Sequence, residues 1–319
     1  MAKILGTDPE SIKLAARELK NGKLVAIPTE TVYGLGGNAL MAETIARIFE
    51  VKKRPSFDPL IVHIDHLEAL DLYCSSIRPE ARLLAEKFWP GPLTLVLPKK
   101  QLIPDIVSAG LDTIAIRMPS HPIARQIISE AGVPIAAPSA NLFSKLSPTL
   151  AEHVNKQIGD QIDYIVDGGK TTIGVESTVV FAGEGEIAVL RPGGLPIEEI
   201  EAVIGPVKKT PINDKVQSPG QLLIHYSPHT PLKIHDPNLP IELPDKNIGY
   251  LAFRHAPSIE AKHVEILSTK GDLVEAAANL FESLHRLDEL NLDLILAEKI
   301  PETGLGQAIM DRLRKAAHK

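Results

Sequence analysis

Residues 23–36 read KLVAIPTETVYGLG, and this stretch decides the fold. Its apolar beginning, 23–27, stops at Pro28, which is the pattern of a short strand buried inside a sheet. Hydroxyl and carboxylate side chains follow at once, in 29–33. Because open α/β sheets bind ligands at the ends of their strands, this polar run predicts a ligand site. Ordinary turn chemistry is the alternative interpretation of the same residues.

The flanking sequence repeats this alternation of helix and strand. Capping residues and apolar spacing predict helices over 8–22, 42–51, 79–88, 121–131 and 149–157. Short apolar runs predict strands over 60–64, 93–97, 113–119, 133–139, 163–167, 177–182 and 187–192. The last two strands face each other across GEGE (183–186), which is a hairpin signal. The mixed order of elements predicts an α/β fold built on a mixed twisted sheet.

Chain length predicts two domains, because 319 residues exceed what one core usually accommodates. Regular periodicity runs through 1–205 and is then lost. Residues 206–231 contain five prolines and few apolar side chains, so we expect a Pro-rich linker that can also act as a lid. A smaller Rossmann-like α/β domain is predicted in 232–319, with strands over 232–236, 247–253, 263–268 and 292–298 and helices over 272–290 and 306–317.

Composition excludes several classes of function. Hydrophobic residues make up 44% and charged residues 23% of the chain, ordinary values for a soluble globular protein. The sequence has no apolar run of about 20 residues and no secretory start, so we expect a cytoplasmic protein without a membrane association. A single cysteine, Cys74, excludes a disulfide framework and a zinc site made of several thiolates. A net charge of −6 and 4% aromatic residues weigh against a protein that coats nucleic acid.

Single motifs in the chain are weak signals. GGKTT (168–172) lacks the earlier glycine of a P-loop. GLGGNA (34–39) matches a loose dinucleotide-binding pattern but is separated from its strand by PTETVY, so we expect 34–39 to be a glycine-permitted loop that packs close to backbone. Lys52 and Arg54 follow a predicted helix and fit a phosphate clamp, or simply complement the helix dipole. His63, within an apolar strand, fits an ordinary core residue as well as a ligand.

Further polar side chains gather where predicted strands end. They are Arg117, Ser139, Asn141, Ser144, Ser147, Ser177, Thr178 and Arg191. Hydroxyls, amides and cations in these places suit a site that binds and orients charged reactants, as adenylate chemistry requires. No Ser/His/Asp or thiolate nucleophile arrangement stands out in the sequence.

The first domain resembles the YrdC-like domain through a series of motifs in chain order. These are KLVAIPTETVYGLG, KKRP with DPLIVHI, WPGPLTLVL, IAIRMPSHP, APSANLFSKLSPT, GVESTVV and VLRPGG. The linker motif PGQLLIHYSP and the C-terminal GLGQAIMDRLRKAA resemble the long, two-domain form of the L-threonylcarbamoyladenylate synthase family. The resemblance covers nearly the whole chain.

The resemblance implies an activity. Such enzymes convert L-threonine, bicarbonate or CO2, and ATP into threonylcarbamoyladenylate and pyrophosphate, through a carbamate that attacks the α-phosphorus of ATP. Mg²⁺ is expected to accompany the triphosphate. A separate threonylcarbamoyl-transferase complex then passes the group to the adenosine beside the anticodon of tRNA. A weak direct contact with tRNA is a further expectation.

The resemblance also implies residue roles. Threonine-contacting positions are Thr31, His63, Arg117, Ser177 and, through its backbone, Ala137. Nucleotide-contacting positions are Lys52, Arg54, Asp58, Thr113, Ser139, Asn141, Ser147, Arg191 and Tyr226. Lys52 and Arg54 are the expected catalytic cations, and Tyr226 is expected to close over the nucleotide and exclude water.

Two other functions are weighed against this one. An RNA-binding module without adenylate chemistry is suggested by Lys208, Lys209 and Lys215, and the net negative charge and few aromatics argue against it. Carbamoyl transfer from carbamoyl phosphate, as in YrdC-like hydrogenase-maturation proteins, is disfavoured because those relatives carry zinc-finger cysteines. Whether the smaller domain has a ligand site of its own stays open.

Overall fold

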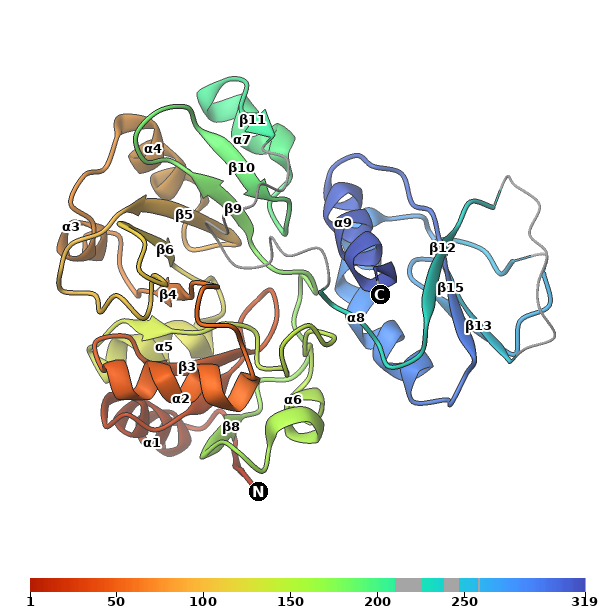
Figure 1. Cartoon of the computed structure of the whole chain (residues 1–319), viewed down its shortest axis with the longest axis horizontal. Helices are drawn as coiled ribbons and strands as arrows, with labels where there is room; N and C mark the ends of the chain where they lie inside the picture. Colours follow the sequence, from red (N-terminus) through yellow and green to blue (C-terminus); the bar gives the residue numbers. More distant parts are fainter. Residues whose placement is uncertain (210–224, 238–246, 258, 319) are drawn as a thin grey trace.

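The protein was analysed as a computed structural model, which describes residues 1–209, 225–237, 247–257 and 259–318. Two α/β units make up the described chain, a large N-terminal one and a smaller C-terminal one (Figure 1). The C-terminal unit turns its helices, not its sheet, toward the larger unit. No helix in the described part of the chain is long and apolar enough to cross a membrane.

The larger unit is built on a mixed sheet, as the sequence predicts. Its described strands are β1 (Lys3–Leu5), β2 (Val25–Ile27), β3 (Gly34–Asn38), β4 (Ile61–His63), β5 (Leu93–Pro98), β6 (Thr113–Arg117), β7 (Ile135–Ala136), β8 (Tyr164–Val166), β9 (Thr178–Phe181), β10 (Ala188–Arg191) and β11 (Lys208–Lys209). They are ordered β1-β8-β2-β3-β7-β4-β6-β5-β9-β10-β11. Parallel neighbours such as β4 and β6 alternate with antiparallel ones such as β2 and β3. The antiparallel pairing of β9 with β10 confirms the predicted hairpin.

The described helices of the larger unit begin and end at residues suited to those places. They are α1 (Pro9–Lys20), α2 (Ala42–Lys52), α3 (Ala69–Tyr73), α4 (Pro79–Phe88), α5 (Pro122–Ala131), α6 (Ala151–Ile158) and α7 (Ile197–Ile204). Asp8 caps α1 by accepting a hydrogen bond of 3.0 Å from the amide of Ser11. Proline occupies the first turn of α1, α4 and α5, where its missing N–H costs nothing.

The central strands present opposite faces to two environments. Val62 of β4 and Ile116 of β6 belong to the main core, together with Ile48 of α2. Because side chains alternate along a strand, Ile61 and Ala115 point to the other face, in a small separate cluster. That second face is the one that holds the pocket described below.

The glycine-rich segment 34–39 is a correction to the sequence prediction. It was expected to be a loop, yet Gly34–Asn38 form β3, buried between β2 and β7. The reason is space: a Cβ on Gly36 would lie 2.9 Å from the carbonyl oxygen of Val25, and one on Gly37 would lie 2.7 Å from a methyl of Thr44. The expected close approach to backbone is present, but the glycines that allow it belong to a strand and not to a loop.

The smaller unit is an α/β fold with a parallel sheet. Its described elements are β12 (Leu232–His235), β13 (Ile248–Ala252), β14 (His263–Ile266), α8 (Leu273–Asp288), β15 (Leu294–Glu298) and α9 (Leu305–Ala317). The strands are ordered β12-β15-β13-β14, and each pairing is parallel. Each of these elements lies within or next to the range predicted for it.

The predicted linker is described in part. At its beginning, β11 pairs in parallel with β10 and extends the edge of the large sheet. Residues 210–224 lie outside the described residues, so Lys215 and the motif PGQLL carry no structural statement. The described end, 225–231, runs between the two units and brings Tyr226 against Phe281 of α8, with ring centroids 5.6 Å apart.

Candidate functional site

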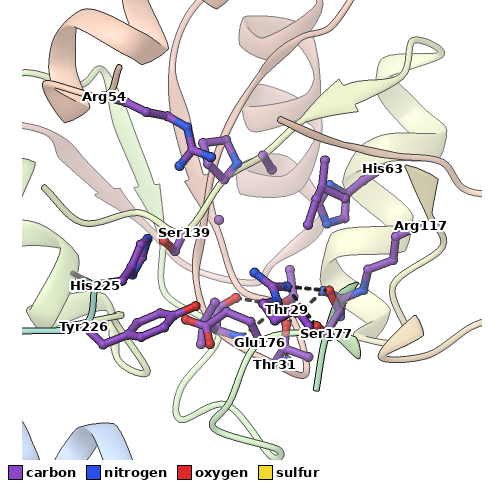
Figure 2. Close-up of a pocket in the computed structure, with 16 residues that line it drawn as sticks. Thr29, Thr31, Arg54, His63, Arg117, Ser139, Glu176, Ser177, His225 and Tyr226 are labelled. Atoms are coloured by element: carbon purple, nitrogen blue, oxygen red, sulfur yellow. Dashed lines mark hydrogen bonds between the residues drawn. The ribbon is translucent and has the colours of Figure 1, made fainter. Parts of the chain in front are cut away.

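A pocket lies on the second face of the large sheet (Figure 2). It is lined by Thr29, Thr31, Val32, Gly34, Arg54, Ile61, His63, Arg117, Ala137, Pro138, Ser139, Glu176, Ser177, Arg191, His225 and Tyr226. Three arginines and one carboxylate are among these lining residues. The arrangement suits an anionic ligand of small-molecule size.

Neighbouring strands bring the first side chains of the pocket together. Within the parallel pair β4–β6, His63 lies opposite Arg117 at the ends of the two strands. Ile61, two residues before His63, points to the same face and lines the pocket floor. The backbone of Ala137, just after β7, donates to the carbonyl of Ile61 at 2.9 Å.

The polar run that follows β2 forms a network around Arg117. The guanidinium donates from Nη1 to Thr31 Oγ1 at 2.9 Å, and its Nη2 lies 2.6 Å from a carboxylate oxygen of Glu30. Thr29 fixes the turn, because its hydroxyl donates to the carbonyl of Val32 at 2.6 Å. Burial works to raise the pKa of Glu30, and the charge and hydrogen bond of Arg117 together with backbone hydrogen bonds outweigh it, so that pKa is lowered. These contacts hold Arg117 in one orientation.

A second network surrounds Ser177, at the beginning of β9. Its hydroxyl lies 2.8 Å from Thr94 Oγ1, and Arg191 Nη2 lies 3.2 Å from the same hydroxyl and 2.8 Å from the Ser177 carbonyl. All three residues are buried. This network presents one hydroxyl and one guanidinium to the pocket. Figure 2 shows the Ser177 side chain on the side of the pocket opposite Arg54.

Arg54 enters the pocket from the chain after α2. Its Nη2 lies 2.9 Å from a carboxylate oxygen of Asp58, and it donates to the carbonyls of Asp58 and Pro59 at 3.0 and 2.9 Å. The Phe143 ring centroid lies 6.0 Å from its guanidinium carbon. The cation is thus oriented before any ligand binds, which lowers the entropic cost of binding.

Several pocket side chains carry polar atoms that are ready for a ligand. The Nδ1 atoms of His63 and His225 and the hydroxyl of Tyr226 are buried and have no hydrogen-bond partner among the described residues. Burial, with the Arg117 charge adding to it, lowers the pKa of His63 to about 3, so this imidazole is neutral. Burial also lowers the pKa of His225 and raises that of Tyr226. Since unpartnered buried polar atoms are costly, a bound molecule is the natural partner for them.

Most of the residues singled out from the sequence meet in this pocket. Those that line it are Thr31, Arg54, His63, Arg117, Ala137, Ser139, Ser177, Arg191 and Tyr226. His63 is buried and lies in the pocket wall, so its role as a ligand contact stays a prediction.

Lys52 and Asn141, also singled out, lie behind the pocket and do not line it. The ammonium of Lys52 donates to the carbonyls of Ser139 and Asn141 at 2.6 and 2.5 Å, while burial and then Arg54 lower its pKa well below 10.5. The side-chain amide of Asn141 donates to the carbonyls of Leu142 and Lys145 at 2.7 and 2.9 Å. Both residues thereby shape the PSAN loop that carries Ser139.

Three other expected residues are also absent from the lining. Asp58 is buried against Arg54, and Ser147 donates to a carboxylate oxygen of Glu176 at 2.5 Å. Thr113 begins β6 opposite Pro98, at the end of the strand away from Arg117. Because four residues of extended chain span roughly 13 Å, the structure does not bring Thr113 to the pocket.

Thr29 belongs to the polar run 29–33 that the sequence predicted as a ligand site, but Glu176 and His225 were given no role. Each of these two is next to a residue that was named, Ser177 and Tyr226, respectively. The signal available was the motif as a whole, PTETVYG, GVEST and HYSP, since neighbouring residues on one bend can face the same cavity. Glu176 could not be assigned from spacing alone, because its partners come from distant parts of the chain.

Comparison with known protein families divides the chain in two. A family model described as "Telomere recombination" matches residues 17–193. A second, described as "Threonylcarbamoyl-AMP synthase, C-terminal domain", matches residues 195–318. The threonylcarbamoyl-AMP synthase of Pyrococcus abyssi is 46% identical over 96% of this chain and 94% of its own length, and that of Bacillus subtilis is 43% identical over 98% and 94%.

The chain belongs to the threonylcarbamoyl-AMP synthase family. The solved structure titled "Crystal structure of P. abyssi Sua5 complexed with L-threonine" matches it with a TM-score of 0.91 at 42% identity, over 99% of this chain and 97% of that one. As a threonylcarbamoyl-AMP synthase family member it is an enzyme, and the alternative of an RNA-binding module without its own chemistry is not supported. The two-unit architecture likewise agrees with the Sua5 structure.

Proposed function

We propose that this chain joins L-threonine, bicarbonate or CO2, and ATP into threonylcarbamoyl-AMP with release of pyrophosphate, and that it does so in the pocket of Figure 2. One observation carries the proposal: a buried pocket with three oriented arginines lies in a chain whose 42%-identical structural match was solved with L-threonine. The product serves modification of tRNA, which favours a cytoplasmic location.

The threonine end is proposed at Thr31, His63, Arg117, Ser177 and the backbone of Ala137. Arg117 is the group suited to the threonine carboxylate, because it is buried and already oriented by Glu30 and Thr31. The Ser177 hydroxyl and the unpartnered Nδ1 of neutral His63 supply polar partners without adding charge. The threonine amine is then left free to react.

The nucleotide end is proposed at Arg54, Arg191, Ser139 and Tyr226, of which Arg191 adjoins the threonine end through Ser177. Arg54 and Arg191 supply the positive charge for phosphate oxygens, and Ser139 and Tyr226 supply hydroxyl groups. Lys52 is assigned a supporting role, through the carbonyls of the PSAN loop that it holds. Three other residues are also assigned supporting roles: Asp58 holds Arg54, Asn141 holds the PSAN loop, and Ser147 holds Glu176. The proposal includes no nucleotide contact at Thr113.

The proposed reaction needs positioning and the exclusion of water more than a protein nucleophile. The amine nitrogen bonds to the carbon of CO2 and loses a proton, which gives a carbamate. A carbamate oxygen then bonds to the α-phosphorus, the bond to the β-phosphate bridging oxygen breaks, and pyrophosphate leaves. Arginines aimed at the phosphates stabilise the developing charge, and the buried pocket protects carbamate and mixed anhydride from hydrolysis.

Magnesium is proposed as a companion of the triphosphate rather than as a resident metal of the chain. Among the described residues no group of three or more His, Cys, Asp or Glu side chains is placed to hold a metal ion. The pocket carboxylate, Glu176, is engaged by Ser147 and Arg312. When bound, Mg²⁺ would neutralise phosphate charge, and the arginines of this chain would orient the same phosphates.

Because threonylcarbamoyl-AMP is an activated mixed anhydride, a consuming step must follow. We propose that a separate threonylcarbamoyl-transferase complex accepts the threonylcarbamoyl group and transfers it to tRNA. Any direct contact between this chain and tRNA should be weak, because the net charge of the chain is −6.

Pyrophosphate release from ATP tests the proposed function. Release should require both L-threonine and bicarbonate, and L-serine should substitute poorly. Release that is indifferent to threonine would mean that the pocket hydrolyses or transfers nucleotide for another purpose.

A further inference from the structure

One wall of the pocket is held from outside the larger unit. Glu176, a lining residue, accepts a hydrogen bond at Oε2 from Nε of Arg312, at 2.7 Å. Arg312 lies in α9 of the C-terminal unit, 136 residues further along the chain. Its side chain is 0% exposed, so water cannot replace either partner of this ion pair.

Arg312 reaches two further parts of the same wall. Its Nη1 donates to the carbonyl of Pro192 at 2.9 Å, directly after pocket residue Arg191. Its guanidinium carbon lies 5.0 Å from the ring centroid of Tyr226, which is cation–π distance. One side chain from the C-terminal unit therefore contacts the wall at three places.

Glu176 passes this constraint on to the ligand-facing atoms. Its second carboxylate oxygen accepts from Ser147 Oγ at 2.5 Å, and its carbonyl accepts from the amide of Gly194 at 2.9 Å. Ser177, the next residue, presents its hydroxyl to the pocket. A displacement of Glu176 would shift Ser177 with it.

We propose that Arg312 is a positioning residue of the catalytic pocket, through which the C-terminal unit completes the site. The inference rests on the proposed function. Arg312 does not line the pocket itself, and it acts on the ligand through Glu176 and Tyr226.

The charges around Glu176 give this role a signature in the pH dependence. Glu176 faces Arg312 from α9, Arg191 from β10, Lys52 from α2 and the phenol of Tyr226. Burial works to raise the pKa of Glu176, and Arg312, followed by Arg191, holds it low. Loss of Arg312 should therefore let Glu176 take up a proton at higher pH than in the native enzyme.

A purely structural role, fastening the two units together, is the alternative. Lys170 provides the matched control, because it also joins the units: its ammonium forms an ion pair with Glu282 and donates to Asn279 Oδ1 at 2.7 Å, both in α8. Lys170 does not line the pocket. Lys170→Met thus removes a cation from the same junction without touching the pocket wall.

The experiment compares the full-length enzyme with Arg312→Met, Arg312→Lys and Lys170→Met, using threonine-dependent pyrophosphate release from pH 5 to 9. We expect Arg312→Met to lose 10- to 100-fold in kcat/KM and its acidic limb to move upward by about one pH unit. Arg312→Lys should recover part of the rate and most of the native profile. Lys170→Met should stay within threefold of the native enzyme with an unmoved profile.

A double variant keeps the test decisive if Arg312→Met folds poorly. In a Glu176→Gln background the loss of Arg312 leaves no buried carboxylate unpaired at position 176. Arg312→Met should therefore lower kcat/KM by less than a further threefold in that background. Equal losses in rate for Arg312→Met and Lys170→Met with an unmoved profile, or full additivity in the double variant, would overturn the inference. A native enzyme without threonine-dependent activity would instead defeat the proposed function.

Discussion

At the scale of single residues, Arg54 is the sharpest test of the nucleotide end. Arg54→Ala removes a charge-assisted contact worth about 1.5–3 kcal/mol, so the KM for ATP should rise roughly 10- to 150-fold. The KM for threonine should change less than threefold. Lys53→Gln is the matched control, since Lys53 is an exposed cation one residue away and should leave both constants unchanged. Equal losses for both substrates would show that Arg54 does not belong to the nucleotide end.

Ser177 tests the threonine end in the same way. Ser177→Ala removes a hydroxyl from the network with Thr94 and Arg191, and threonine affinity should fall about tenfold, or about 1.4 kcal/mol. ATP affinity, also measured by calorimetry, should stay within twofold. Ser108→Ala offers a control, because Ser108 is a buried serine whose hydroxyl donates to loop carbonyls away from the pocket. Unchanged threonine affinity would contradict the assignment.

Residue types and motifs predicted much of this pocket, and they failed for definite reasons. Arg117 and Ser177 were predictable because polar groups at strand ends need a partner, and Arg54 because a cation that follows a helix fits a phosphate clamp. Lys52 was not, because the sequence cannot tell whether an ammonium faces the pocket or the carbonyls behind it. Glu176 could not be predicted as a buried pocket residue, because the cation that stabilises its buried charge, Arg312, lies 136 residues away in the sequence.

At the scale of elements, the junction of α6 with α8 predicts a pH-dependent stability. His153 and His285 stack there with ring centroids 3.9 Å apart. Burial, with His285 adding to it, lowers the pKa of His153 to about 3, and burial also lowers that of His285. In the unfolded chain these two histidines bind protons near pH 6.5, whereas in the folded chain they bind them only at lower pH. The free energy of unfolding should therefore decrease as the pH falls below about 6.5.

The corresponding measurement is the thermal midpoint between pH 7.5 and 5. The midpoint should fall on acidification, and His153→Phe should make the fall shallower, by up to about 1.4 kcal/mol per pH unit for one titrating group. His263→Phe, in the half-exposed strand β14, should leave the slope as it is. An unchanged slope in His153→Phe would mean that the stack does not titrate with folding.

The segment 225–231 gives the second prediction at this scale. Tyr226 is 1% exposed, and its ring lies between His225 and Phe281, with centroids 4.0 and 5.6 Å away. Tyr226→Ala should lower synthesis at least tenfold and raise the fraction of intermediate lost to hydrolysis, because the pocket opens to water. Tyr226→Phe should lose roughly threefold, since it removes one hydroxyl and keeps the ring. Tyr250→Phe is the control, because Tyr250 is a buried tyrosine of the C-terminal unit. If Tyr226→Ala made the product at the native rate, the segment 225–231 would only connect the two units.

Elements with clear periodicity and capping residues were predicted well, and short or crowded ones were not. The helix predicted over 79–88 coincides with α4, whose first residue is Pro79. α3, of five residues, is too short to show a period. β3 was mistaken for a loop because a glycine-rich segment is typical of loops, although its close approach to neighbouring backbone was expected and is seen against β2.

At the scale of the whole molecule, the two α/β units and the mixed sheet followed from length and pattern. Their contact did not, because it depends on pairs such as Arg312–Glu176 and on Gly174, where a Cβ would lie 2.4 Å from the carbonyl oxygen of Ala277 in α8. The boundaries at 205/206 and 231/232 stay predictions, and most of the interval between them lies outside the described residues.

The central claim is that this whole molecule makes threonylcarbamoyl-AMP, and the most direct measurement is detection of that product by mass spectrometry after incubation with ATP, L-threonine and ¹³C-bicarbonate. We expect an adenylate that carries one ¹³C atom, formed only when all three substrates are present and in amounts that match the pyrophosphate released. Release of pyrophosphate or AMP without a labelled adenylate, or an adenylate that forms without threonine, would contradict the account.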